Sequence, residues 1–215
     1  MSVVLHGYRY SVYLRIVRMA LLEKGVSWTH AEVDPFAEIV AAGYLALNPF
    51  GRVPTLVHDG FVLYETAAIT RYVDEAFDGP SLQPGHPRDR ARMTQVIAIL
   101  DSYGYWPMVR QVFSPRVFNA ALGRVADEAV ITSGLEQSHR VLRALDGLVG
   151  GGRFVAGDRL SLADLHLAAM FAYFGAAPEG DAAIASYPRV GAWWRENRHL
   201  GSLLATDPGL PSPGD

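Results

Sequence analysis

Cysteine is absent from this chain of 215 residues. Its absence excludes disulfide bonds, cysteine-ligated zinc, iron–sulfur clusters and a cysteine nucleophile. Any thiol chemistry must therefore use a thiol that a ligand brings in. Long apolar runs are also missing: none approaches the roughly 20 residues that cross a bilayer, and residues 1–7 lack the basic and apolar regions of a secretory signal. We expect a cytoplasmic protein that makes no contact with a membrane.

An excess of basic residues is missing as well. The 19 basic and 22 acidic residues give a net charge of −3 and a pI near 6.2, which argues against a nucleic-acid partner. Lysine occurs once, at Lys24, and all other basic residues are arginine. This bias is typical of a GC-rich genome and favours a bacterial source. Hydrophobic residues make up 50% of the chain, which excludes intrinsic disorder and supplies the core of one large or two small domains.

The first part of the chain predicts a small α/β domain. The apolar run of residues 3–5 indicates a buried strand, and the helix that follows stops at Glu23-Lys24-Gly25, where glycine is a common terminator. Asp59-Gly60 between two short apolar runs is a strong hairpin signal. The other predicted elements are a strand in residues 26–33, a helix within residues 35–47, hairpin strands at residues 54–57 and 61–64, and a helix over residues 66–77.

The rest of the chain predicts an all-helical domain, because no strand pattern follows residue 88. Residues 79–87 are rich in proline and glycine, which indicates a linker. Predicted helices cover residues 88–113 and 119–149, with a break near Ser114-Pro115, and two more begin at Ser161 and after Pro188. We therefore expect an α/β domain in residues 1–78, a linker in 79–87, a helical domain in 88–207 and a flexible tail in 208–215.

Several polar motifs predict structure rather than chemistry. Ser161 and Asp164 form an S-x-x-D capping box, in which the two side chains bond first-turn and cap amides. His139 and His166 fall on separate predicted helices without metal-binding spacing. The sequence has no glycine-rich phosphate loop, so we expect neither a metal nor a nucleotide cofactor.

The most informative stretch is residues 48–56, followed by residues 65–69. Pro54 opens a strand, and a cis Val53-Pro54 bond would leave the backbone of Val53 free to pair with an extended peptide. Glu65 and Thr66 stand where a strand gives way to a helix, whose N-terminus attracts a carboxylate, while Glu65 can accept from an amino group. Together they would hold both ends of an amino acid. The alternative is that Thr66 merely caps its helix.

This stretch resembles the glutathione site of the glutathione S-transferases, in the form N-P-x-G-x-V-P-x-L followed by E-[ST]-x-A-I. The resemblance extends over nearly the whole chain, including the S-x-x-D box. It implies a thioredoxin-like first domain, an all-α second domain, and an enzyme that transfers glutathione to a small apolar electrophile. On this resemblance Val53 pairs with the cysteinyl backbone of glutathione, Pro54 is cis, and Glu65 with Thr66 holds the γ-glutamyl end.

The resemblance places the residue that activates the thiol between the first strand and the first helix. Ser11 falls on the serine of the phi-, theta- and zeta-like classes, which implies a serine-type member. A thiol with a pKa of about 8.5 is mostly protonated at pH 7, and a hydroxyl that donates to the thiolate near a helix N-terminus favours the anion. Three alternatives remain: Ser11 is a plain N-cap, the phenol of Tyr8 acts instead, or the backbone N–H of Ser11 or Val12 does.

Two departures from the family pattern concern the subclass. Phi-like members carry a His-Lys pair that meets the glycyl carboxylate, whereas this chain has Ile39-Val40-Ala41; we expect Arg52 to replace that cation. Zeta-like members carry Ser-Ser-Cys where this chain has Ser11-Val12-Tyr13. Two other functions stay open: a zeta-like cis–trans isomerase that returns its glutathione, and a non-catalytic binding or scaffold protein with the same fold.

The second substrate is expected between the domains. Tyr103, Trp106 and Arg110 are spaced i, i+3 and i+7 and would share one helix face, with Tyr10 opposite them. Pro107 predicts a kink that opens a pocket wall. Arg110 would suit an acidic group on the electrophile. The alternative is that this aromatic stripe belongs to the core.

The resemblance also implies a homodimer, in which the first domain of one subunit meets the helical domain of the other across a two-fold axis. Arg71 and Tyr72 on the helix after the site, and Arg90 or Arg92 at the start of the second domain, are the candidate contacts.

Overall fold

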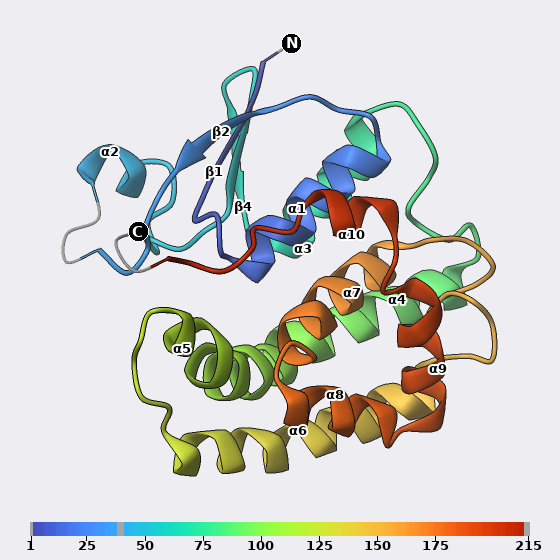
Figure 1. Ribbon diagram of the computed structural model, residues 1–215. Helices are drawn as coiled ribbons and strands as arrows, with labels where there is room; N and C mark the ends of the chain where they lie inside the picture. Colours follow the sequence, from blue (N-terminus) through green and yellow to red (C-terminus); the bar gives the residue numbers. More distant parts are fainter. Residues whose placement is uncertain (1, 38–40, 213–215) are drawn as a thin grey trace.

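The computed structural model describes residues 2–37 and 41–212, arranged as two domains stacked one above the other (Figure 1). The strands of the first domain are β1 (Val3–Gly7), β2 (Thr29–Glu32), β3 (Thr55–His58) and β4 (Phe61–Tyr64). They form a mixed sheet with the order β2-β1-β3-β4. β1 and β2 are parallel, whereas β3 is antiparallel to both β1 and β4. This is the α/β domain that the sequence predicted.

Helices cover both faces of this sheet. α1 (Val12–Glu23) and α3 (Thr66–Ala76) lie on one face, and α2 (Ala42–Leu45) lies on the other (Figure 1). α1 begins at its cap Ser11 and ends where Gly25 takes a φ of 67°, a conformation that favours glycine. The apolar side chains of α1 are almost all buried, so this helix is packed on every side.

Two predicted elements of this domain are shorter than expected. The strand predicted in residues 26–33 is only β2, an edge strand whose side chains are mostly exposed. The helix predicted within residues 35–47 is only the turn of α2, and residues 38–40 lie outside the described residues. The Asp34 carboxylate accepts the Phe36 N–H at 2.8 Å, so turn chemistry here prevails over the helix preference of the alanines.

The second domain is built around one long helical run. α4 (Pro87–Ile99) continues through two π-helical segments, η1 (Leu100–Gly104) and η2 (Trp106–Phe118), into the short α5 (Asn119–Ala121). The remaining helices are α6 (Glu128–Leu148), α7 (Leu162–Phe174), α8 (Pro178–Ala185), α9 (Pro188–Asn197) and α10 (Gly201–Ala205).

The break predicted at Ser114-Pro115 is wrong. Pro107 and Pro115 both lie inside η2, where the run continues. In an α-helix a proline ring clashes with the carbonyl four residues earlier, whereas a π-helix shifts the bonding to residues five apart. The wider turns therefore accommodate both prolines. The chain breaks instead at residues 122–127, where Asp127 caps the start of α6.

α8 and α10 were not predicted from the sequence. They have eight and five residues, too few for a helical period to show. Pro178 in the first turn of α8 is a signal that could have revealed it. Gly180 lies so close to the Phe174 carbonyl that an added Cβ would be 2.0 Å from its oxygen, so only glycine fits there.

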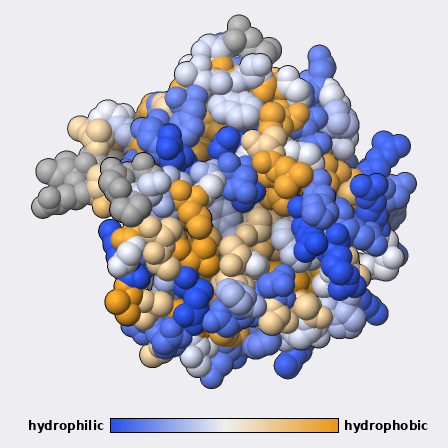
Figure 2. Space-filling model, viewed as in Figure 1, coloured by the Kyte–Doolittle hydropathy of each residue, from blue (hydrophilic) through white to orange (hydrophobic). Residues whose placement is uncertain are grey.

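The end of the chain returns to the first domain. Arg15 of α1 is 6% exposed, and its Nη2 donates to the carbonyl of Leu203 in α10 at 2.8 Å. Residues 208–212 have no helix or strand and follow the seam between the domains, with Pro211 buried (Figure 1). Figure 2 shows hydrophobic residues gathered in the middle of this face, where the domains meet. Of the segment expected to be a flexible tail, Pro211 is buried, whereas Gly209, Leu210 and Ser212 are exposed; residues 213–215 lie outside the described residues.

α7 is the centre of the helical domain. All of its residues except Ala172 are buried, as expected for a helix that is apolar on every side. It contacts α1, α4 and η2. Its N-terminus is the capping box predicted from the sequence. Within residues 2–37 and 41–212, no helix is long and apolar enough to cross a membrane.

The Asp164 carboxylate ties this helix to two other segments. It accepts the N–H groups of Val155 at 2.8 Å and Ser161 at 2.9 Å. It also accepts the hydroxyl of Ser161 at 2.7 Å and the indole N–H of Trp193 at 3.0 Å. One fully buried carboxylate therefore satisfies four buried donors.

Replacing Asp164 with Ala should lower the free energy of unfolding by about 3 kcal/mol or more, because four buried donors lose their acceptor. Urea denaturation followed by circular dichroism measures the loss. Asp158→Ala makes the same chemical change at an exposed position and should shift stability by less than about 0.5 kcal/mol. Equal shifts in the two variants would contradict this role of Asp164.

Candidate active site

A cavity of about 740 Å³ lies between the two domains and is lined by both. Of the residues that the sequence predicted for the site, the structure brings all but one to this cavity. Those that line it are Tyr8, Tyr10, Ser11, Arg52, Val53, Pro54, Glu65, Thr66, Trp106 and Arg110.

Tyr103 is the exception, and its predicted place in the second-substrate pocket is corrected. Its side chain is 68% exposed and does not line the cavity. The lining residues of the run recur every four positions, as at Trp106, Arg110 and Ser114. The wider turns of a π-helix change which positions share a face, compared with an α-helix of about 3.6 residues per turn.

Sequence reasoning missed several lining residues, and it missed those of the helical run for the same reason. The run contributes Asp101, Tyr105, Val109 and Ser114, and the first domain adds Pro35 and Phe36. A search for side chains four positions apart in residues 101–118 would have found the lining residues of the run. Phe36 gave no signal, because it lies in an irregular segment.

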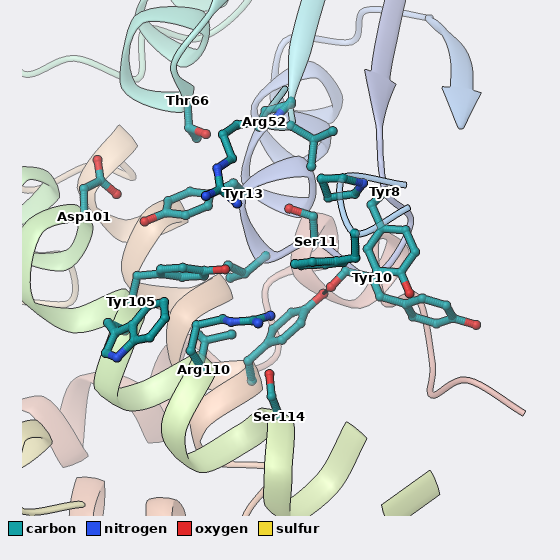
Figure 3. Close-up of a pocket in the computed structure, with 18 of the residues that line it drawn as sticks. Tyr8, Tyr10, Ser11, Tyr13, Arg52, Thr66, Asp101, Tyr105, Arg110 and Ser114 are labelled. Atoms are coloured by element: carbon teal, nitrogen blue, oxygen red, sulfur yellow. Dashed lines mark hydrogen bonds between the residues drawn. The ribbon is translucent and has the colours of Figure 1, made fainter. Parts of the chain in front are cut away.

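Ser11 lies at the start of α1 with its hydroxyl directed into the cavity (Figure 3). Its Oγ accepts the N–H of Leu14 at 3.3 Å, so it is an N-cap. A hydroxyl also has one hydrogen to donate, and within the described residues no acceptor for that hydrogen is found. The backbone N–H of Ser11 already donates to the Tyr8 carbonyl at 2.8 Å. Of the two predicted backbone donors, only that of Val12 therefore remains.

The loop before β3 is fixed by buried hydrogen bonds. The Val53-Pro54 bond is cis, as predicted. The Asn48 amide donates to the Arg52 carbonyl at 2.8 Å, and the Tyr44 hydroxyl donates to the same oxygen. Within the described residues the backbone N–H and C=O of Val53 have no partner, so they are open to an extended ligand.

Glu65 and Thr66 stand at the N-terminus of α3, which faces the cavity. The cap is Glu65, with φ 72° and ψ 115°, so the alternative that Thr66 caps the helix is wrong. Positive φ is rare outside glycine and clusters at functional sites. The conformation presents the Glu65 carboxylate and the first-turn N–H groups of α3 to the same space.

Near the start of α3, the Tyr13 hydroxyl and the Asp101 carboxylate are directed at one another (Figure 3). Burial raises the pKa of Tyr13, and the negative charge of Asp101 raises it further. The Tyr13 phenol therefore stays protonated and acts as a donor. Behind Asp101 lies the fully buried His166, with its Nδ1 3.8 Å from Asp101 Oδ1.

Two arginines supply the positive charge of the cavity. The guanidinium groups of Arg52 and Arg110 reach into it from opposite sides (Figure 3). Burial raises the pKa of Tyr105, and the positive charges of Arg110 and Arg52 oppose that rise. Throughout the described part of the chain, no carboxylate lies within ion-pair distance of either arginine.

Aromatic rings form a continuous wall. Tyr8 is edge-on to Tyr10 at 5.4 Å and to Phe36 at 5.9 Å between ring centroids, and Tyr10 is edge-on to Phe118 at 5.3 Å. These rings line the cavity. The alternative that the stripe of Tyr103 and Trp106 belongs to the core is wrong, because both side chains are exposed. The wall suits a flat apolar ligand.

Two other predictions concern a metal site and the His-Lys pair of phi-like members. Among the described residues, no group of three or more His, Asp or Glu side chains could hold a metal ion. Residues 39 and 40, at the place of the missing His-Lys pair, lie outside the described residues.

Two family models match the chain. The glutathione S-transferase N-terminal domain matches residues 5–81, and the glutathione S-transferase C-terminal domain matches residues 105–199. The chain is 30% identical to glutathione S-transferase 3 of Zea mays over 203 residues, which cover 92% of this chain and 90% of the relative. It is 34% identical to glutathione S-transferase F10 of Arabidopsis thaliana over 181 residues, which cover 82% of this chain and 83% of the relative.

A solved structure has the same arrangement of domains. It is glutathione S-transferase I from maize in complex with an atrazine glutathione conjugate, and it superposes with a TM-score of 0.81 and 25% identity. The superposition covers 96% of this chain and 96% of that one. The similarity therefore includes both domains.

Proposed function

The chain belongs to the glutathione S-transferase family, and we propose that its interdomain cavity activates the thiol of glutathione for attack on a small apolar, aromatic electrophile. Its family makes it a transferase, which sets aside the non-catalytic scaffold. The matched relatives are plant members of the phi class. They favour a phi-like assignment over the theta-like and zeta-like ones. The bacterial source and the cytoplasmic location stay predictions.

The charges of the cavity complement those of glutathione, which carries two carboxylates and one ammonium at neutral pH. The N-terminus of α3 with Thr66 suits the α-carboxylate, and Glu65 suits the ammonium beside it. Arg52 suits the glycyl carboxylate and takes the place of the His-Lys pair. The open backbone of Val53 lies between these ends and suits the cysteinyl residue.

That arrangement directs the glutathione thiol toward the start of α1. There the Ser11 hydroxyl can accept from Leu14 and donate to a thiolate at the same time. The first-turn N–H groups and the dipole of α1 add to the stabilisation of the anion. Lowering the thiol pKa by about 2 units needs roughly 2.7 kcal/mol, which one charge-assisted hydrogen bond and a helix terminus supply.

The thiolate then attacks an electrophilic carbon of the substrate. A carbon–sulfur bond forms, the leaving group departs with its bonding electrons, and the thiol proton goes to solvent. The aromatic wall of Tyr8, Tyr10, Phe36 and Phe118 suits a flat acceptor. The conjugate named for the maize structure contains atrazine, which supports an aromatic acceptor here. The observation that carries the proposal is the meeting of Ser11 and the Glu65-Thr66 helix start in one cavity.

We also propose a homodimer. Arg71 is already paired with Glu75 at 2.8 Å, and Arg90 donates to the carbonyls of Pro84 and Gly85, so the arginines are weaker candidates for the contact than the sequence suggested. Between them lies an open hollow along α4, where the exposed residues Ala91, Thr94 and Ala98 leave room for a second helix.

We expect Ser11→Ala to raise the pKa of the bound thiol by one or more units, because the thiolate loses its hydroxyl donor. Conjugation of a generic aryl halide at pH 6.5 should fall about tenfold or more, and the deficit should shrink as the pH rises and the thiol ionises unaided. A pH–rate profile measures both effects.

Tyr8→Phe is the matched control, since it also removes one hydroxyl from the same cavity, and its effect should stay below about threefold. If Tyr8→Phe abolishes the low-pH rate and Ser11→Ala does not, the site is tyrosine-type. If neither variant changes the profile, the Val12 N–H holds the thiolate.

Titration calorimetry tests the glutathione site directly. The protein should bind glutathione with a Kd below about 1 mM, and Glu65→Gln should weaken binding about tenfold through loss of a charge-assisted bond. A glutathione analogue without the α-amino group should bind both proteins equally. Glu75→Gln on the same helix is the control and should bind glutathione as before. Binding of millimolar strength or weaker in the wild type would contradict the proposed function.

Light scattering at micromolar concentration should give twice the chain mass of 23.5 kDa. Ala98→Arg should yield a monomer, because a large charged side chain fills the hollow along α4. Ala120→Arg, at an exposed position of α5, should remain dimeric. A wild-type protein that is monomeric would reject the dimer.

A further inference from the structure

One charged side chain of the cavity has no charged group of glutathione to pair with in the proposed binding mode. The ammonium of glutathione pairs with Glu65. Its glycyl carboxylate pairs with Arg52, and its α-carboxylate lies at the N-terminus of α3. Asp101 faces the Tyr13 hydroxyl and lies near His166. Arg110 then remains as a cation that has no carboxylate within ion-pair distance in residues 2–37 and 41–212.

The surroundings of Arg110 leave one part of its guanidinium accessible. Its Cζ lies 5.0 Å from the ring centroid of Phe36, in a cation–π contact. It also stands beside the Tyr105 hydroxyl. Because Phe36 and Tyr105 each take up part of the guanidinium, its remaining N–H groups are the ones that a ligand can reach. A planar fork of N–H groups matches a carboxylate.

The walls next to Arg110 define the rest of the ligand. Phe36 joins the edge-to-face series that runs through Tyr8 and Tyr10 to Phe118. Figure 3 shows Arg110 extending toward Tyr10, away from the pair formed by Tyr13 and Asp101. An anion at Arg110 would therefore be attached to an aromatic ring and would lie apart from the Asp101 carboxylate.

We propose that Arg110 determines the specificity for the second substrate, by binding the carboxylate of an aromatic electrophile. The proposal rests on the proposed function and narrows its substrate class from an apolar aromatic compound to an aromatic carboxylate.

The test uses two electrophiles that differ in a single ring substituent, charged in one and neutral in the other: 4-chloro-3,5-dinitrobenzoate and its carboxamide. In both, the thiolate attacks the carbon that bears chlorine, a carbon–sulfur bond forms, and chloride leaves with the electrons of the carbon–chlorine bond. The measured quantity is the ratio of kcat/KM for the benzoate to kcat/KM for the amide. An effect of a substitution that changes kcat/KM equally for both substrates cancels in this ratio.

Arg110→Gln should lower that ratio about tenfold or more, as expected for loss of a hydrogen bond between charged groups. Arg110→Lys should lower it less, since it keeps the charge but not the fork. Arg143→Gln makes the same change in net charge on the exposed face of α6 and should leave the ratio as in the wild type. An unchanged ratio in Arg110→Gln, or an equal fall in Arg143→Gln, would overturn the proposal.

A binding measurement separates this proposal from the proposed function. The glutathione conjugates of the benzoate and the amide are titrated into the wild type and Arg110→Gln by calorimetry. Selective loss of affinity for the benzoate conjugate supports the role of Arg110, even if turnover is slow. Equal affinities in both proteins reject that role while leaving the transferase intact. If neither glutathione nor either conjugate binds, the proposed function fails and the role of Arg110 fails with it.

Discussion

The packing of α1 between the sheet and α7 is the constraint on which the site depends. α1 is buried on nearly every side, and it contacts α3, α7 and α10. Its position therefore couples the two domains, with the buried guanidinium of Arg15 holding the α10 carbonyl. Because Ser11 and Tyr13 start this helix, they are placed by the core rather than by a loop. The first-turn N–H groups of α1 consequently open into the seam where the domains meet.

Local chemistry made much of the fold predictable. The Asp59-Gly60 turn, the stop at Gly25 and the S-x-x-D box each depend on residues close in sequence, and the structure confirms all three. The π-helical run could not be predicted, because a proline usually signals the end of an α-helix. The error at Ser114-Pro115 and the error at Tyr103 have this single cause. Both arose from treating as α-helical a segment that has wider turns: the first from the rule for proline, the second from the α-helical period.

The residues of the candidate site likewise fall into those that the sequence predicted and those that it did not. Residues within a continuous motif, such as Val53, Glu65 and Thr66, were located from the sequence alone and line the cavity. Residues that reach it from distant segments were missed, including Phe36 and Asp101. No local pattern marks Phe36, which lies in an irregular segment, whereas Asp101 belongs to the period of four in the helical run. The positive φ of Glu65 also has no sequence signal, because the residue is not a glycine or an asparagine.

The geometry at Ser11 shows that its two predicted roles are compatible. As a cap, its oxygen accepts the N–H of Leu14, and this bond uses only a lone pair. The hydroxyl hydrogen stays available for a donated bond, at the end of α1 where the helix dipole also favours an anion. Capping fixes the rotamer of the side chain and so lowers the entropic cost of donating to a thiolate. A phenol at the same position would be too long to cap the helix, so a serine can serve both functions where a tyrosine cannot.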